Sequence, residues 1–398
     1  MPTHRLDPLF LSDLDGLRAL RRHLHAHPEL SWQEQGTQHV LRAQLAGLGL
    51  APRDIAGTGL VVDTRPDLPV SVALRADLDA LPIREETGLP YASAIPGCMH
   101  ACGHDGHMAI LVGVARALVR AAAAVNVRLI FQPAEEGGPG AARVVREGAL
   151  EGVPEIYGLH NWPALATGSA AVAEGPVMAA SRIFDATFRG RGGHGSQPQL
   201  TADPILAAAQ FVTAAQAVVS RMVHPLAPAV VSFGSVHGGT RGNIIPDEVH
   251  LKGTLRALDD ALVAEMEARL RAHARAAGEP LGVQSEVSFS VPYPVTFNGP
   301  AGVARVRRAI EAGAEPWAGP TPFPCLAAED FSLYLERVPG AYFFLGSGRP
   351  DGSSPGLHRA DYDFDDEAVP VGIRLFLLLV EATSGVALLP LPEPPEAP

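Results

Sequence analysis

The segment VSVALRADLD, residues 70–79, begins with apolar residues and ends in two acids, Asp77 and Asp79. Such a segment is typical of a strand buried in a parallel sheet. Two later segments are similar: VRLIF at 127–131 comes shortly before a glutamate pair, and EIYGL at 155–159 ends at a histidine. Open α/β sheets carry their functional sites at the carboxyl ends of strands. The sequence therefore predicts an α/β sheet with polar side chains gathered along one edge.

Helical patterns surround these predicted strands. Apolar residues recur at helical spacing over residues 13–27, until Pro28 ends the pattern, and again over 109–124. The same α/β texture returns after Pro292 and Pro294. The elements predicted there are helices near 301–314 and 329–338, a strand at 341–345 and a helix near 366–383.

The middle of the chain differs from both ends. From about Met178 the segments FDATFRG, VVSFGSV, DEVHLKGTLRA and SEVSFSV alternate apolar and polar residues, as half-buried antiparallel strands do. One helix is predicted to open at Asp203, which a proline follows, and another covers 259–277. We therefore expect an α/β fold whose mixed sheet is flanked by helices and interrupted by an inserted α+β domain. The expected boundaries are 1–179 and 293–398 for the sheet domain and 180–292 for the insertion.

Composition limits the classes of partner. The 398-residue chain has a formal net charge of −12. Nucleic acids and anionic membranes both select cationic surfaces, so neither is an expected partner. Three cysteines cannot form a disulfide framework, the first residues lack the pattern of a signal peptide, and the apolar run at 375–380 is too short to cross a bilayer. We expect a soluble cytoplasmic protein.

The stretch HACGHDGH, residues 100–107, concentrates metal-binding side chains. Imidazole and thiolate bind borderline-soft divalent ions, carboxylates complete such sites, and a carboxylate left over can act as a general base on an activated water. A structural zinc site would be closed by four ligands with no carboxylate to spare. The chain has a larger set, which favours an open two-metal site in a hydrolase. The candidates are Cys102, His104, Glu136, His160 and His358, with the other member of the glutamate pair, Glu135, free to act as the base.

Other patterns point to other chemistry. A thiol nucleophile at Cys102, activated by flanking histidines, stays open as an alternative. Residues 190–195 match the dinucleotide fingerprint GxGxxG, but a proline intrudes and no acid follows at the required spacing. Residues 352–356 match GxSxG, but the residue after the serine is Pro355, which has no N–H for an oxyanion. We expect structural or surface roles for His23, His25, His27, His100 and His107, and a strand-end cap at Asp77.

The chain resembles the M20 metallopeptidase family, in its amidohydrolase branch of hippurate hydrolases, auxin-conjugate hydrolases and N-acyl-amino-acid deacylases. The motifs that carry the resemblance extend over nearly the whole chain. They include RRHLHAHPELSWQE, PGCMHACGHDGHM, FQPAEEGGPGA, RGRGGHGSQP, GGTRGNIIPDEVHLKG and GLHRADYDFDDEA. The resemblance implies a zinc-peptidase-like sheet domain whose insertion acts as a lid and dimerisation domain.

The resemblance also implies a role for each site residue. Cys102, His104, Glu136, His160 and His358 would hold two divalent ions per subunit, with Zn, Mn, Co and Ni all compatible with the ligand types. Glu135 would be the general base, Asp79 would orient a ligand, and His194 would reach the other subunit's site and stabilise the oxyanion. Asn243 and Arg256 would bind the substrate. The chain departs from the family pattern at Gln199 and Arg182, which bear on the substrate pocket and the domain junction.

These inferences predict a homodimeric or larger amidohydrolase that uses a metal-activated water to cleave hippurate-like N-acyl or N-aroyl amino acids. A metallo-carboxypeptidase or dipeptidase of the same family is the alternative within enzymes. A non-catalytic binding protein on the same fold is the alternative from another class, and the intact ligand set argues against it.

Overall fold

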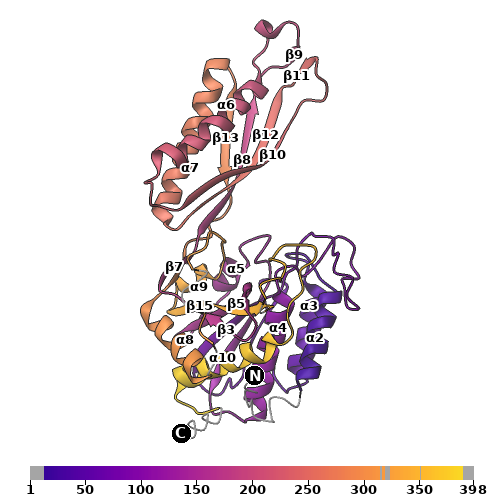
Figure 1. Ribbon diagram of the computed structural model, residues 1–398, viewed down its shortest axis with the longest axis vertical. Helices are drawn as coiled ribbons and strands as arrows, with labels where there is room; N and C mark the ends of the chain where they lie inside the picture. Colours follow the sequence, from indigo (N-terminus) through magenta and orange to yellow (C-terminus); the bar gives the residue numbers. More distant parts are fainter. Residues whose placement is uncertain (1–12, 314–315, 319–322, 350, 389–398) are drawn as a thin grey trace. The chain divides into compact units, whose positions relative to one another are not determined.

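The computed structural model describes residues 13–313, 316–318, 323–349 and 351–388. These residues belong to two compact units (Figure 1). The first unit is drawn from Met1–Gly175, Phe297–Phe323 and Asp330–Pro398, and the second from Pro176–Thr296 and Pro324–Glu329. The chain passes between the units four times, and two of these passages lie within the short strands β7 (Gly175–Met178) and β14 (Thr296–Asn298).

A seven-stranded sheet forms the centre of the first unit, in the order β1-β2-β4-β3-β5-β15-β6. The strands β4, β3, β5 and β15 run parallel, whereas β1, β2 and β6 pair antiparallel, so the sheet is mixed as predicted. The strand bounds are β1 (Arg53–Ile55), β2 (Gly59–Asp63), β3 (Val70–Asp77), β4 (Asn126–Gln132), β5 (Ile156–Ala166), β6 (Ala170–Ala171) and β15 (Gly340–Gly348).

Helices flank this sheet (Figure 1). One of them, α4 (His104–Arg120), is apolar on nearly every side and is buried along most of its length, as expected for a helix packed between other elements. It contacts α2 (Leu14–Ala26), β3 and α10 (Ala368–Ser384). The other helices of the unit are α3 (Gln35–Ala46), α5 (Gly140–Arg146), α8 (Pro300–Ala312) and α9 (Ser332–Leu335).

Three predicted elements have different bounds in the structure. The helix expected at 109–124 begins at His104, because Gly103 adopts a left-handed conformation that opens the helix there. The strand expected to end before His160 continues to Ala166, because its second half pairs with β15. The helix expected at 329–338 is confined to α9. The first two differences depend on tertiary packing, which local periodicity does not record.

The second unit has the predicted α+β layout. Four antiparallel strands, in the order β10-β12-β8-β13, form its sheet, and two helices pack on one face (Figure 1). Asp203 caps the first helix as predicted, with its side chain accepting the N–H groups of Ile205 and Leu206. The element bounds are β8 (Ala180–Arg189), α6 (Pro204–Ala217), β10 (Ala229–Gly238), β12 (Glu248–Ala257), α7 (Asp260–Gly278) and β13 (Gln284–Phe289), with a small ladder of β9 (Gly193–His194) and β11 (Ile244–Ile245).

By length and composition, one helical segment among the described residues, Pro204–Met222, is able to cross a membrane. Core helices of soluble proteins pass the same test, and this segment buries Ala207, Phe211 and Ala215 in the core of the second unit. The segment is therefore weak evidence for a membrane span.

Candidate metal centre

Side chains with metal-binding atoms converge in the first unit. Among the described residues, five sets each place one such atom per residue within 4.8 Å of the others; two of them bring in Asp77 with His107 and Glu329 with Asp330. The other three contain only predicted ligands and the predicted base, and we call their combined members the ligand cluster. These three sets are Cys102, His104 and His160; Cys102, Glu136 and His358; and His104, Glu135 and Glu136. The structure therefore brings together all five predicted ligands and the predicted base.

The start of α4 positions two members of the cluster. Gly103, between Cys102 and His104, has φ 91°, and a Cβ at this position would overlap the Asn161 side chain. Only glycine satisfies both conditions. The tight turn therefore lets the thiol and the first imidazole of the helix point at one centre.

Both buried histidines of the cluster present the same ring nitrogen to it. His104 Nδ1 lies 2.8 Å from the backbone oxygen of Asp79, and His160 Nδ1 lies 2.7 Å from that of Asn161. Because a carbonyl oxygen only accepts, each Nδ1 carries a hydrogen, and Nε2 is the nitrogen of each ring that would bind a metal in the neutral form. Fixing the ligand tautomer through the other ring nitrogen is usual in metal sites.

One carboxylate organises the glutamate pair. Asp79 Oδ1 accepts the backbone N–H of Glu135 at 3.0 Å, and Asp79 Oδ2 accepts that of Glu136 at 2.9 Å. Ser31 donates its hydroxyl to the same Oδ2 at 2.6 Å. The Asp79 carboxylate itself is 3.5 Å from His104 Nδ1, so the backbone of Asp79 holds the imidazole while its side chain holds the turn.

The last member, His358, comes from a distant part of the chain. It has φ 62°, a left-handed conformation that non-glycine residues adopt at some energetic cost, often at functional sites. Its N–H is bound by the backbone oxygen of Ala101 at 2.8 Å, and its Nε2 lies 3.1 Å from Glu136 Oε1. The His358 side chain is 52% exposed whereas His160 is buried, so the cluster meets solvent on the His358 side.

Charge in the cluster suits a cation. Burial lowers the pKa of His104, but nearby carboxylates outweigh burial and raise this pKa to about 10. The carboxylates belong to Asp77, Asp79 and Glu136. Burial and the nearby glutamate charges raise the pKa of the Cys102 thiol well above its usual value. A thiol nucleophile needs a lowered pKa, which these neighbours do not provide, whereas a bound divalent cation would itself stabilise the Cys102 thiolate.

The donors fit a divalent metal. His104 Nε2 is buried and, among the residues that the structure describes, has no hydrogen-bond partner, while the buried Glu136 Oε1 lies 3.1 Å from His358 Nε2. Cys102 Sγ lies 3.3 Å from His160 Nε2. Sulfur, imidazole and carboxylate donors aimed at one point are the ligand types of zinc and related ions.

A buried network surrounds the cluster. His107 Nδ1 lies 2.6 Å from Asp77 Oδ1, and Arg75 donates to Asp77 Oδ2 at 2.5 Å. Against the effect of burial, His104, Arg75 and His107 hold the pKa of Asp77 well below its usual value. Asp77 therefore does more than cap a strand end. His107 is buried in this network, as a structural histidine is.

The substrate-binding candidates lie in the second unit. His194 is exposed on β9, and its Nδ1 accepts the backbone N–H of Ser196 at 3.1 Å, which leaves the hydrogen on Nε2. Asn243 lies beside it, since its backbone oxygen accepts the Gly195 N–H at 2.9 Å. Arg256 lies near the C-terminal end of the ten-residue β12, roughly 25 Å along the strand from its first residue, Glu248. Its guanidinium donates to the Leu326 backbone oxygen at 3.1 Å.

The two positions that depart from the family pattern also lie in the second unit. Arg182 of β8 pairs with Glu267 of α7, with 2.8 Å between Nε and Oε1. Gln199 is exposed in a short 3-10 helix, Pro198–Leu200.

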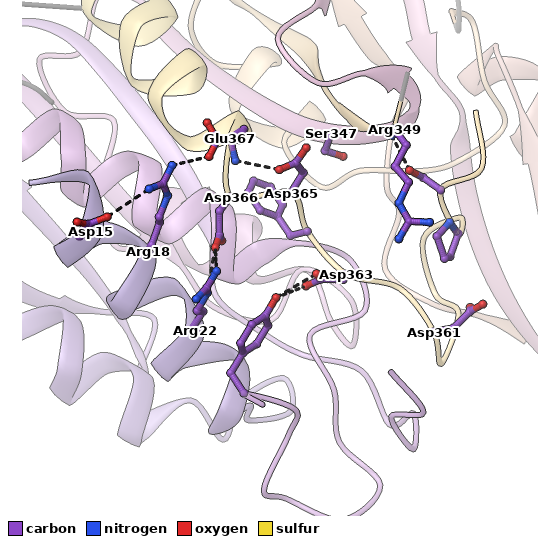
Figure 2. Close-up of a pocket in the computed structure, with 14 residues that line it drawn as sticks. Asp15, Arg18, Arg22, Ser347, Arg349, Asp361, Asp363, Asp365, Asp366 and Glu367 are labelled. Atoms are coloured by element: carbon purple, nitrogen blue, oxygen red, sulfur yellow. Dashed lines mark hydrogen bonds and ion pairs between the residues drawn. The ribbon is translucent and has the colours of Figure 1, made fainter. Parts of the chain in front are cut away.

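A cavity of about 650 Å³ lies apart from the ligand cluster (Figure 2). Its wall is polar, and Arg18, Arg22 and Tyr91 contact its acids, as the dashed lines in Figure 2 show. None of the ligand cluster lines it. The lining residues include Ser347, Arg349, Asp361, Asp363, Asp365, Asp366 and Glu367. Its lining holds six acids and three arginines, and it includes none of the predicted site residues, so we assign it no chemistry.

Sequence reasoning missed Ser31, Glu34 and Asn161. Their side chains hydrogen-bond to residues next to the ligand cluster: Ser31 to Asp79, Glu34 to the Ala134 backbone and Asn161 to His107. Asn161 donates to the Tyr362 hydroxyl at 2.6 Å, and its Oδ1 lies 2.8 Å from His107 Nε2. The motif PELSWQE contains two of these residues, but nothing local to it reveals which partners they meet.

Comparison with known proteins agrees with this geometry. A model of peptidase family M20/M25/M40 matches residues 73–382. N-acetyl-L-cysteine deacetylase of Bacillus subtilis (strain 168) is 38% identical, over 91% of this chain and 87% of its own length. Thermostable carboxypeptidase 1 of Saccharolobus solfataricus is 36% identical, over 92% and 94% of the two chains. A solved dinuclear metal-binding peptidase of the M20 family from Bacillus subtilis has a TM-score of 0.76 at 34% identity, over 93% of this chain and 98% of that one.

Proposed function

The chain belongs to peptidase family M20/M25/M40, and from that premise we propose that it hydrolyses the amide bond of N-acyl or N-aroyl amino acids with Glu135 as general base. Hydrolases of this family depend on metal ions and act on amides, and the chain is a metal-dependent amidohydrolase. The proposal adds the substrate class and the residue roles.

The observation that carries the proposal is the placement of two adjacent glutamates at one cluster. Glu136 is grouped with Cys102 and His358 in one set and with Glu135 and His104 in another, and Glu135 is also grouped with Glu329 and Asp330. We propose that two divalent ions are held by Cys102, His104, Glu136, His160 and His358. When bound, such ions polarise the scissile carbonyl and lower the pKa of a water molecule.

The residues of the chain would then manage the protons. Glu135 is buried, and Asp79 holds its backbone N–H, which fixes where its side chain leaves the turn. It would take a proton from the attacking water and return it to the leaving nitrogen, the two steps that a general base serves in amide hydrolysis. Asp79 would position the two glutamates by binding the backbone of their turn, and it would orient His104 through its own backbone oxygen.

The second unit carries the remaining substrate-binding candidates. His194 carries its hydrogen on Nε2, the form that donates to a developing oxyanion. We propose that His194 and Asn243 serve the site of a second copy of the chain. Arg256 would bind the substrate carboxylate, which its guanidinium fork matches. A cytoplasmic homodimer is part of the proposal, and the free state of all three cysteines suits a reducing compartment.

A substrate panel tests the proposal. Protein reconstituted with zinc or manganese is assayed on N-acetyl and N-benzoyl amino acids beside free dipeptides and N-protected peptides. We expect the acyl amino acids to be cleaved with the higher kcat/KM. Preference for peptides would instead support the carboxypeptidase or dipeptidase alternative. The 36% identity to thermostable carboxypeptidase 1 is the observation that favours this alternative.

A further inference from the structure

Ala134, the residue before the glutamate pair, has an unusual backbone. Its φ is 53°, in the left-handed region that residues with a Cβ rarely adopt. Its own oxygen accepts the Gly140 N–H at 3.0 Å, and the residue is fully buried. Because a left-handed residue turns the chain, the conformation of Ala134 decides the direction in which the two following glutamates leave the turn.

A buried carboxylate holds this residue in place. Glu34 Oε1 accepts the backbone N–H of Ala134 at 2.8 Å, and Glu34 Oε2 accepts the Thr58 hydroxyl at 2.6 Å. The Glu34 residue has no exposed surface. Together with the two bonds from Asp79, three consecutive backbone N–H groups of the turn therefore end on buried carboxylates.

The segment that carries Glu34 is itself fixed against the site. The Glu29 carboxylate accepts the N–H groups of Gly36 and Thr37 at 3.0 and 2.7 Å, which braces the start of α3. The Ala80 N–H donates to the Glu29 backbone oxygen at 2.8 Å, next to Asp79. Glu34 is thus held at a fixed distance from the strand end that carries Asp79.

We propose that Glu34 is a positioning residue for the Glu135–Glu136 pair, holding Ala134 in its left-handed conformation and thereby aiming both glutamates at the ligand cluster. Glu34 does not touch the reacting atoms. The roles of the two glutamates, as base and as ligand, rest on the proposed function. Their placement rests on the hydrogen bonds alone.

Two variants of similar size isolate the acceptor. Glu34→Gln keeps an oxygen for the Ala134 N–H, whereas Glu34→Met fills the space without one. Loss of an outer hydrogen-bond partner of a metal site typically reduces metal affinity or activity about 10- to 100-fold. We expect Glu34→Met to show a loss of this size in zinc affinity, measured by competition with a chelator, or in kcat with a smaller change in KM. Glu34→Gln should stay within about threefold of the wild type, since its amide oxygen can accept the Ala134 N–H while its NH2 donates to the Thr58 hydroxyl.

Thr58→Val is the matched control. It removes the other hydrogen bond of Glu34 and leaves the bond to Ala134 in place. An equal loss in this variant would show that Glu34 acts through general packing and would overturn the proposal, as would a Glu34→Met protein within about threefold of the wild type in both zinc affinity and kcat.

A double variant checks the route through Ala134. Glycine adopts positive φ without a Cβ penalty, so adding Ala134→Gly to Glu34→Met should restore part of the lost zinc affinity. No recovery would contradict the proposal. If Glu34→Met does not fold, Glu34→Ala takes its place in the same comparisons. Zinc affinity needs no substrate, so a wild-type protein that cleaves no N-acyl amino acid would refute the proposed function and leave this test intact.

Discussion

The Asp79 carboxylate binds the backbone of both glutamates in the candidate site, with Asp79 Oδ1 3.0 Å from the Glu135 nitrogen. An acid at the end of β3 thus sets the turn after the neighbouring strand β4, which runs parallel to it. The backbones of the proposed base, Glu135, and the proposed ligand, Glu136, are therefore anchored to the same group.

Glu135→Gln should nearly abolish hydrolysis and leave metal content close to that of the wild type. The substitution keeps the size of the side chain and removes its ability to take a proton, and general acid–base catalysis typically contributes about 10²- to 10⁴-fold. Steady-state kinetics and metal analysis of the purified protein check this. A variant with full activity would remove Glu135 from its proposed role.

Asp79→Asn should lower kcat/KM about 10- to 100-fold, because the amide NH2 cannot accept one of the two backbone N–H groups. Ser31→Ala is the control, since it deletes a hydroxyl from the same carboxylate and spares both backbone bonds. We expect the smaller loss in Ser31→Ala. Equal losses would mean that the hydroxyl, and not the turn, accounts for the effect of Asp79.

Gly103→Ala should reduce both stability and metal binding. The new Cβ meets the Asn161 side chain, and the φ of 91° is unfavourable for alanine. Gly152→Ala is a matched control, because Gly152 also has positive φ but open space around its Cβ position. The control should lose only the backbone penalty, about 1–2 kcal/mol, in denaturant unfolding, with metal content retained. Similar behaviour of the two variants would contradict the packing argument.

The contribution of His25 to stability should depend on pH. His25 Nδ1 lies 2.8 Å from Asp105 Oδ2. Burial lowers the pKa of His25, but the hydrogen bonds to Asp105 and Glu85 outweigh burial and raise this pKa to about 9. Because the pKa in the folded state exceeds the ordinary value of 6.5, the stabilisation is complete below about pH 6.5 and is lost as the pH rises through about 9.

Urea unfolding of the wild type and His25→Gln between pH 6 and 9.5 measures this effect. The difference in unfolding free energy should shrink by at most about 1.4 kcal/mol per pH unit across that window. A difference that stays constant with pH would show that His25 does not hold its proton in the folded protein.

Local sequence patterns predicted much of the fold. The apolar segment at 127–131 lies within β4, the alternating segments form the antiparallel sheet of the second unit, and Asp203 caps α6 as expected. These features depend on residues close together in the chain, so periodicity and capping chemistry record them. The boundaries at His104 and Ala166 depend on contacts with distant residues and were therefore missed.

The types of the candidate ligands were also readable from the sequence, because thiol, imidazole and carboxylate side chains gathered in a few motifs are the donors that divalent metals select. The sequence by itself determined which metal-binding side chains are present and which strands and helices carry them. Only the tertiary structure decided how these side chains are positioned relative to one another. Glu34 meets Ala134 across 100 residues, and Asp79 meets Glu135 across 56. Such bonds form because buried polar groups must find partners wherever the fold brings them, and no local pattern along the chain encodes which partners those are.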